Sequence, residues 1–316
     1  MFKLRRGGEQ AGGWALVKRA IQSFNNNRAL FLMVLPGFLV VLIFHYFPMY
    51  GILMAFKNFS PRLGIWNSKW VGLTHFQGFF NNPLSGRLMT NTLLLGIYSL
   101  LWSFPAPIIL ALLFNELRAL RYKKLVQTVS YFPYFISVVV VCGMLREMTS
   151  REGLFNQITA LFGREPKMFL LEPKYFRTIF IASGIWQGVG FGSIIYLAAL
   201  SGVDPELYDV ADIDGAGRFM KMIHISWQAI KPTTIVLLIF NLGGILGTDF
   251  QKVLLLYTPD TYSVADVIGT YVYREGLLGG RYESATAIGL FMSAISFVIL
   301  VLANAISRRL SETSLW

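Results

Sequence analysis

"ALFLMVLPGFLVVLIF", residues 29–44, contains no charged residue and decides the class of fold. A run of this length approaches the roughly 20 apolar residues that an α-helix needs to cross a hydrocarbon core. A membrane β-strand would instead alternate apolar and polar residues over about ten positions, and this run does not alternate. Because backbone polar groups in lipid must bond to one another, the segment is predicted to be a membrane-spanning helix.

The composition of the whole chain agrees with this prediction. Of its 316 residues, 54% are apolar and 14% are charged, whereas soluble domains average about 25% charged residues. We therefore predict an all-α integral membrane protein of about six transmembrane helices, built as one domain over residues 1–316. The six predicted spans are Leu30 to Phe47, Thr92 to Phe114, Val126 to Leu145, Phe176 to Leu200, Pro232 to Leu254 and Ala285 to Ser307.

The fifth predicted span contains several residues that interrupt a helix or carry charge. The interrupting residues in its second half are Gly243, Gly244, Gly247, Asp249, Gln251 and Lys252. We expect the helix to end early there and to continue as irregular backbone near the far surface.

Basic residues next to the spans indicate the orientation of the chain. They are dense in residues 1–29 and in "RALRYKK", 118–124, and such segments remain on the cytoplasmic side. The outer loop at 146–177 also carries basic residues, which weakens the asymmetry. Both termini and the segment 204–231 are predicted to be cytoplasmic, in the plasma membrane. The net charge of +11 is explained by the orientation of the chain in the membrane. The sequence contains no basic stripe interleaved with aromatic residues, which a nucleic-acid-binding surface would need.

The predicted cytoplasmic segment 204–231 is acidic and has the signals of two short helices. Asp204 is a suitable N-cap, Pro205 suits the first helical position, and Glu206 adds favourable charge there. Gly215 can take the left-handed conformation that ends a helix, and "AGRFMKMIHI" then resumes helical spacing. We predict a helix–turn–helix hairpin.

The hairpin is interpreted as a docking element for a partner protein. Leu207, Val210 and Ala211 share one face of the first helix, while Asp209 and Asp212 point toward water. The alternative is an amphipathic linker on lipid headgroups, but such linkers carry lysine and arginine, and anionic lipid would repel carboxylates.

"YDVADIDGAGRFMKMIHIS", 208–226, resembles the EAA motif of permease subunits of ATP-binding-cassette importers. Asp209, Val210 and Ala211 occupy the Glu-Ala-Ala positions, and Ile225 occupies that of the later isoleucine. Trp227 and Gln228 stand where this motif usually has Leu-Pro. The resemblance implies that coupling to the ATPase involves Glu206, Asp209, Val210, Ala211, Asp212, Gly215 and Ala216.

The likeness extends to residues 35–80, 188–211 and 264–280, which are similar to permeases for polysaccharides and complex oligosaccharides. It implies a type I importer permease fold in a bacterial plasma membrane. The implied partners are a second permease, expected to be a different chain, two ATPase subunits, and an extracytoplasmic binding protein that delivers an oligosaccharide.

No segment matches G-x-x-x-x-G-K-[ST], so ATP and Mg²⁺ are expected on the ATPase subunits and no catalysis on this chain. Cys142 is the only cysteine, which gives no metal-ligand spacing. No cofactor or metal is predicted here.

Sugars need flat apolar surfaces and a few hydrogen-bonding groups. Within or beside the third to fifth spans, and just beyond the fifth helix, the candidate pathway residues are Tyr131, Trp186, Gln187, Phe191, Tyr196, Asn241 and Asp249. The alternative is that these side chains pack between helices or anchor at headgroups.

Three other functions remain open. An ion-coupled secondary carrier of a sugar-like solute would need ionisable groups at mid-membrane, and His45 and Asp249 are the candidates. A membrane enzyme of glycan assembly would need converging catalytic groups, and a scaffold would show no ATPase activity stimulated by substrate.

Overall fold

The structure is a computed structural model that describes residues 27–117, 119–310 and 315. The chain divides into two compact units, Met1–Leu53 and Met54–Trp316. The predicted basic segment 1–29 lies almost wholly outside the described residues, as does Arg118 of the basic turn. That the chain is one domain remains a prediction.

The described part of the first unit, from residue 27 onward, is a helix with exposed apolar side chains. It consists of α2 (Arg28–Val41), a π-helical turn η1 (Leu42–Tyr46) and a 3₁₀ segment η2 (Phe47–Phe56), whose end enters the second unit. Together they form a candidate membrane span with a mean hydropathy of 2.4. Apolar side chains that remain exposed suit a lipid environment, and the predicted span Leu30 to Phe47 lies within this helix.

The second unit begins with a small β-hairpin. Strands β1 (Lys57–Asn58) and β2 (Lys69–Trp70) pair antiparallel, with Lys57 opposite Trp70. The loop between them contains α3 (Gly64–Asn67), and Lys57 Nζ donates to the Ile65 carbonyl at 2.8 Å. Helix α4 (Thr74–Phe80) follows.

Three long helices of the second unit confirm the predicted spans. Helix α5 (Ser85–Tyr98), the π-helical η3 (Ser99–Ser103) and α6 (Pro105–Asn115) form one continuous span. The other two are α10 (Pro173–Leu200) and α17 (Tyr282–Leu310). Each is long and apolar enough to cross a membrane.

The third predicted span, Val126 to Leu145, falls on a bent pair of helices, and that it is one span remains a prediction. Helix α7 (Leu120–Tyr131) with η4 (Phe132–Phe135) meets α8 (Val138–Met148) at a bend of 98°. Ile136 is extended, and the Ser137 hydroxyl accepts from the Val140 N–H as the N-cap of a new helix. The described residues therefore hold five spanning helices, or six if the bent pair counts as one. The outer loop adds α9 (Leu154–Ala160) and η5 (Phe169–Leu171).

The fifth span begins earlier than predicted and ends early, as expected. Helix α11 (Pro205–Ile213) precedes it, and α12 (Arg218–Lys221), the π-helical η6 (Met222–Ser226) and α13 (Trp227–Gly243) then form one candidate span. Pro232 lies inside α13. After turns at 244–249, α14 (Phe250–Leu256) is a separate short helix.

Short elements then lead to the last span. These are η7 (Pro259–Thr261), α15 (Tyr262–Ala265), α16 (Ile268–Tyr271) and the π-helical η8 (Val272–Leu278).

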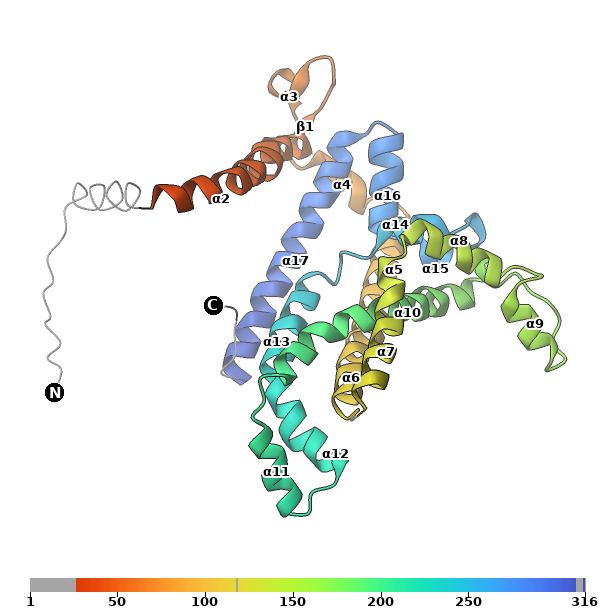
Figure 1. Ribbon diagram of the computed structural model, residues 1–316. Helices are drawn as coiled ribbons and strands as arrows, with labels where there is room; N and C mark the ends of the chain where they lie inside the picture. The colour runs from red at the N-terminus through yellow and green to blue at the C-terminus, as the bar shows by residue number, and fades with distance from the viewer. Residues whose placement is uncertain (1–26, 118, 311–314, 316) are drawn as a thin grey trace, which may run out of the picture. The chain divides into compact units, whose positions relative to one another are not determined.

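Helix α10 organises the core of the second unit. It contacts α6, α13, α7 and α15 along its length, while α13 runs beside α17 (Figure 1). One apolar cluster joins Phe176 and Phe180 of α10 to Val253 and Leu256 of α14. A second joins Tyr196 and Leu200 of α10 to α6 and α13. These contacts fix α14 and α13 against α10.

Two glycines on α10 allow other segments to approach closely. A side chain at Gly192 would meet Pro107 of α6 at 3.0 Å, and one at Gly190 would collide with the Ser130 carbonyl of α7. At Gly188 a Cβ atom would meet nothing within 4 Å. Gly190 therefore allows α7 to approach α10, and Gly192 allows α6 to approach it.

Gly190→Ala is expected to lower the thermal unfolding temperature of the purified protein, because the added methyl must separate α7 from α10 at a cost of about 1–3 kcal/mol. The matched control is Gly188→Ala, which should leave stability unchanged or raise it by up to about 1 kcal/mol through helix propensity. Detergent-solubilised thermal unfolding measures both. Equal melting temperatures for the two variants would contradict the packing described for Gly190.

Candidate functional site

The acidic hairpin begins with a capped helix. The Asp204 carboxylate accepts from the Glu206 backbone N–H at 3.0 Å, and Pro205 occupies the first turn of α11. Proline loses no hydrogen bond at that position, and Glu206 faces the positive end of the helix dipole. The structure confirms the predicted start of the helix.

Gly215 ends α11 in the left-handed conformation. Its φ is +77°, and the following Ala216 N–H donates to the Ala211 carbonyl at 2.8 Å. Gly217, which precedes α12, has an ordinary φ of −68°. Only Gly215 therefore needs the conformational freedom of glycine, as the sequence indicated.

The second arm of the hairpin differs from the predicted short helix, because α12 continues through η6 into α13 as one span from Arg218 to Gly243. No loop separates α12, η6 and α13, so the hairpin joins a candidate membrane helix directly. The connection between α12 and α13 therefore contains no loop that could absorb a movement of the hairpin.

Three side-chain contacts brace the hairpin. Lys221 Nζ donates to Asp212 Oδ1 at 2.6 Å, which ties α12 to α11. The Tyr208 and Ser226 hydroxyls lie 2.9 Å apart, and the Asn115 side-chain amide donates to the Tyr208 hydroxyl at 3.4 Å. Asp212 thus serves an internal ion pair as well as pointing to water, and Tyr208 links α11 to the end of α6.

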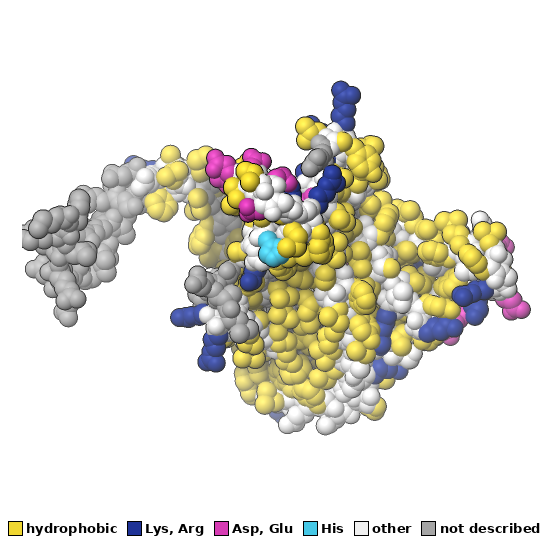
Figure 2. Space-filling model, turned by 90° about the horizontal axis from the view of Figure 1, so that it is seen from below, with side chains coloured by type: hydrophobic (Ala, Val, Ile, Leu, Met, Phe, Trp, Pro, Cys, Tyr) yellow, Lys and Arg dark blue, Asp and Glu magenta, His cyan; other side chains and the backbone are white. Residues whose placement is uncertain are grey.

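The outer surface of the hairpin combines acidic and apolar side chains. Leu207, Val210 and Phe219 are exposed, and Ile213 is 85% exposed. All five carboxylate residues from 204 to 214 are exposed as well. Figure 2, which looks at the molecule from the side of α11 and α12, shows hydrophobic and acidic side chains together on the hairpin. Exposed apolar groups with a charged rim are typical of a protein-binding surface.

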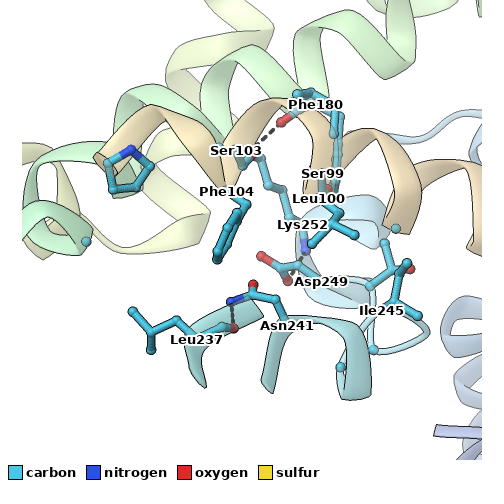
Figure 3. Close-up of a pocket in the computed structure, with 18 of the residues that line it drawn as sticks. Ser99, Leu100, Ser103, Phe104, Phe180, Leu237, Asn241, Ile245, Asp249 and Lys252 are labelled. Atoms are coloured by element: carbon cyan, nitrogen blue, oxygen red, sulfur yellow. Dashed lines mark hydrogen bonds between the residues drawn. The ribbon is translucent and has the colours of Figure 1, made fainter. Parts of the chain in front are cut away.

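A cavity of about 530 Å³ lies at the other end of this helical connection. It is bounded by η3 and α6, by α10, and by α13 with the turn that follows it. Figure 3 shows Asn241, Asp249 and Lys252 close to Ser99, Ser103 and Phe104. A cavity of this size with few polar groups and apolar walls is typical of a small-molecule site.

The cavity brings together three of the seven predicted pathway residues. Tyr196, Asn241 and Asp249 line it. Trp186 is exposed elsewhere on α10, the Gln187 amide donates to the Ile136 carbonyl at 3.0 Å, and Phe191 stacks on Tyr134 at 3.9 Å between ring centroids. Tyr131 lies at the end of α7 and outside the cavity lining. Substrate contact by any of the seven remains a prediction.

Lys252 is a cavity residue that the sequence reasoning missed. It is 3% exposed, and its Nζ donates to the Phe180 carbonyl at 3.1 Å and lies 5.0 Å from the centre of the Phe180 ring. Asp249 Oδ1 accepts from the Lys252 backbone N–H at 3.1 Å, as the N-cap of α14. In the sequence, the feature that could have identified Lys252 is a single lysine that follows Asp249 by three residues within an apolar run.

A second buried polar cluster, also missed, holds the segment between α14 and α17. Asp266 is fully buried and pairs with Arg274 at 2.9 Å, and Thr270 Oγ1 donates to it at 2.7 Å. The hydrogen bonds to Asp266 raise the pKa of Arg274 above its usual value, so this guanidinium stays charged. Asn91 donates to the Asp266 carbonyl at 3.0 Å and accepts from Arg177 at 2.9 Å. These partners satisfy the buried groups and indicate a structural role.

Within the described part of the chain, no group of three or more histidine, cysteine, aspartate or glutamate side chains could hold a metal ion.

Comparison with known proteins agrees with this arrangement. The polygalacturonan/rhamnogalacturonan transport system permease protein YteP of Bacillus subtilis (strain 168) is 42% identical over 300 residues, covering 95% of this chain and 94% of that protein. A chain from the crystal structure of a bacterial ABC transporter involved in the import of the acidic polysaccharide alginate is 43% identical, with a TM-score of 0.85 over 92% of this chain and 99% of that chain.

A further solved structure is the bacterial alginate ABC transporter in complex with an alginate pentasaccharide-bound periplasmic protein. One of its chains is 42% identical to this chain, covers 93% of it and 99% of its own length, and has a TM-score of 0.85. The family model "Binding-protein-dependent transport system inner membrane component" matches residues 84–312. The chain belongs to this family of inner membrane transport components.

Proposed function

We propose that this chain is the permease subunit of an ATP-driven importer that passes an oligosaccharide from an extracytoplasmic binding protein into the cytoplasm. The observation that carries the proposal is the direct helical connection between the hairpin at 204–231 and the cavity beside α13. The family match and the relatives' transport of polysaccharides support it. A purely structural hairpin would not need exposed apolar residues beside its carboxylates.

The hairpin is proposed to face the cytoplasm together with both termini. The hairpin, the turn between α6 and α7, and the carboxyl end of α17 lie toward the same end of the second unit (Figure 1). Arg121, Lys123 and Lys124 in α7, and Arg308 and Arg309 in α17, place basic charge at that end. Basic residues concentrate on the cytoplasmic side of spans, which supports this orientation in the plasma membrane of a bacterium.

The ATP-hydrolysing machinery is proposed to reside on separate subunits. Two ATPase subunits would bind ATP and Mg²⁺, and one would dock on this hairpin through Glu206, Asp209, Val210 and Ala211. Gly215 and Ala216 would hold the turn, and Asp212 would brace it through Lys221 at 2.6 Å. A second permease, proposed to be a different chain, would complete the pathway.

The transported sugar is proposed to be acidic. Polygalacturonan and alginate, which the relatives at 42–43% identity transport, are polymers of uronic acids. The cavity of this chain contains a buried lysine and several hydroxyl and amide groups, which suits an acidic sugar. An ion-coupled carrier would instead show uptake that follows an ion gradient without ATP.

Charge reversal at Asp209 is expected to uncouple this protein from its ATPase. Asp209→Lys places a positive charge on the exposed face of α11 and should weaken ATPase binding by about 10-fold or more, as the loss of a charged hydrogen bond does. Co-purification of the ATPase and ATP-dependent uptake in proteoliposomes measure this effect. Glu152→Lys is the control, since Glu152 is an exposed carboxylate outside the hairpin. The docking role fails if both variants bind the ATPase and transport equally.

Gly215→Ala is expected to impair coupling while leaving the membrane helices folded. The added Cβ meets open space, but φ of +77° costs a non-glycine residue about 1–2 kcal/mol. The hairpin turn should therefore loosen, lowering uptake per ATP hydrolysed. Gly217→Ala, at a φ of −68° and also in open space, is the matched control and should behave like the unchanged protein. Equal coupling ratios in the two variants would show that the turn geometry is unimportant.

A further inference from the structure

Lys252 is a buried cation without a carboxylate partner. It is 3% exposed, and no ion pair involving it is present among the residues that the structure describes. By contrast, the buried Asp266 is matched by Arg274 at 2.9 Å. An unpaired ammonium in a buried site is costly and is retained where it has a function.

The interactions that Lys252 does make leave room for another acceptor. An ammonium group has three N–H donors, and one of them serves the Phe180 carbonyl at 3.1 Å. The Phe180 ring offers a further, weaker attraction at 5.0 Å. Neither group carries a negative charge, so both leave the charge of Lys252 unneutralised.

Asp249 is the nearest carboxylate to Lys252 along the chain, but it bonds to the backbone of Lys252 and not to its ammonium group. Its Oδ1 caps α14 by accepting the Lys252 backbone N–H at 3.1 Å. Its side chain lines the same cavity (Figure 3). Asp249 therefore adds a negative charge beside the lysine, and this charge would oppose the binding of any anion.

The cavity also has space and hydrogen-bonding groups beside Lys252. A Cβ atom at Gly184 would lie 3.5 Å from Lys252 Nζ, so a larger residue there would crowd the ammonium group. Thr248 Oγ1 is buried and has no hydrogen-bond partner among the described residues, and it lines this cavity together with Ser99 and Ser103. Hydroxyl groups of this kind pair well with sugar hydroxyls.

We propose that Lys252 determines the charge selectivity of the cavity by binding the carboxylate of a uronic acid unit, while Asp249 limits the strength of that binding. A neutral sugar offers the lysine only hydroxyl oxygens, whereas a carboxylate forms a charge-assisted hydrogen bond and neutralises it. Moderate binding suits a transporter, because the sugar must also leave. The inference rests on the proposed function, namely that the cavity lies on the route of an imported oligosaccharide.

The test uses the complete importer, with its partner subunits and binding protein, in proteoliposomes. Two acidic probes, an alginate pentasaccharide and an oligogalacturonate of equal length, are compared with their carboxyl-reduced neutral counterparts. Each probe is loaded to saturation on the binding protein, and uptake by each variant is divided by uptake by the unchanged importer. This ratio removes the selectivity of the binding protein itself.

Lys252→Gln should reduce uptake of an acidic probe by about 10-fold or more, with less than about a twofold change for its neutral counterpart. Lys252→Arg, which keeps the charge, should retain most acidic uptake. Asp249→Asn preserves a good N-cap and should shift the preference toward the acidic probe. Lys167→Gln, which removes an exposed lysine outside the hairpin and outside the cavity lining, should change neither.

An equal loss of acidic and neutral uptake in Lys252→Gln, or no loss, would overturn the inference, because a merely structural lysine would act on both probes alike. If the importer with Lys252→Gln does not assemble, Asp249→Asn tests the inference. A stronger preference of this variant for the acidic probe supports the inference, and an unchanged preference overturns it. An unchanged importer that moves neutral probes with ATP but neither acidic probe also overturns it, while leaving the proposed function intact. Failure to move any probe would contradict the proposed function itself.

Discussion

The helix that runs without a break from Arg218 to Gly243 is the connection on which the rest of the account depends. No loop interrupts this helix, although Pro232 cannot donate a backbone hydrogen bond and η6 is π-helical, so a displacement at one end has a continuous path to the other. One end is an exposed acidic hairpin held by the Lys221–Asp212 ion pair, and the other borders the cavity. Under the proposed function, this connection would transmit movement of the hairpin to the cavity.

The end of that helix illustrates how the membrane limits irregular backbone. Non-helical segments at membrane depth occur where protein or a water-filled cavity surrounds them. The turns at 244–249 fit this rule, since Gly244, Gly247 and Thr248 line the cavity. Helix α14 then packs Val253 and Leu256 against α10, and this packing carries Lys252 to the cavity wall. The break in the helix therefore forms part of the cavity wall and does not merely end a span.

The sequence predicted the class of fold, most spans and the hairpin, because these features depend on local patterns. Long apolar runs, the Asp204–Pro205 start and the glycine at 215 each act within a few residues. The bend between α7 and α8 was missed because the third apolar run hides the helix start at Ser137. The sequence also did not show that the fifth helix continues across Pro232. A proline usually marks a helix start or break, but it is tolerated within a membrane helix when neighbouring groups satisfy the freed carbonyl.

The candidate site was only partly predictable, because its residues meet through tertiary packing. Lys252 contacts Phe180, 72 positions away in the chain, and Asn91 contacts Asp266, 175 positions away. A single sequence without packing cannot distinguish such a lysine from one that reaches water. For the same reason Trp186 and Phe191 fitted a sugar-binding pattern although they lie outside the cavity lining.

The most direct test of the helical connection is the labelling rate of a cysteine at Asn241, in a Cys142→Ser background, by a membrane-impermeant thiol reagent added from outside. The rate is compared between the nucleotide-free importer and the importer trapped with ATP and vanadate, with and without two glycines inserted after Ser226. If the helix couples hairpin and cavity, the labelling rate changes between the two states in the protein with the continuous helix and stays the same in the protein with the inserted glycines. Both proteins are expected to hydrolyse ATP when vanadate is left out. An equal change in the interrupted protein would contradict it.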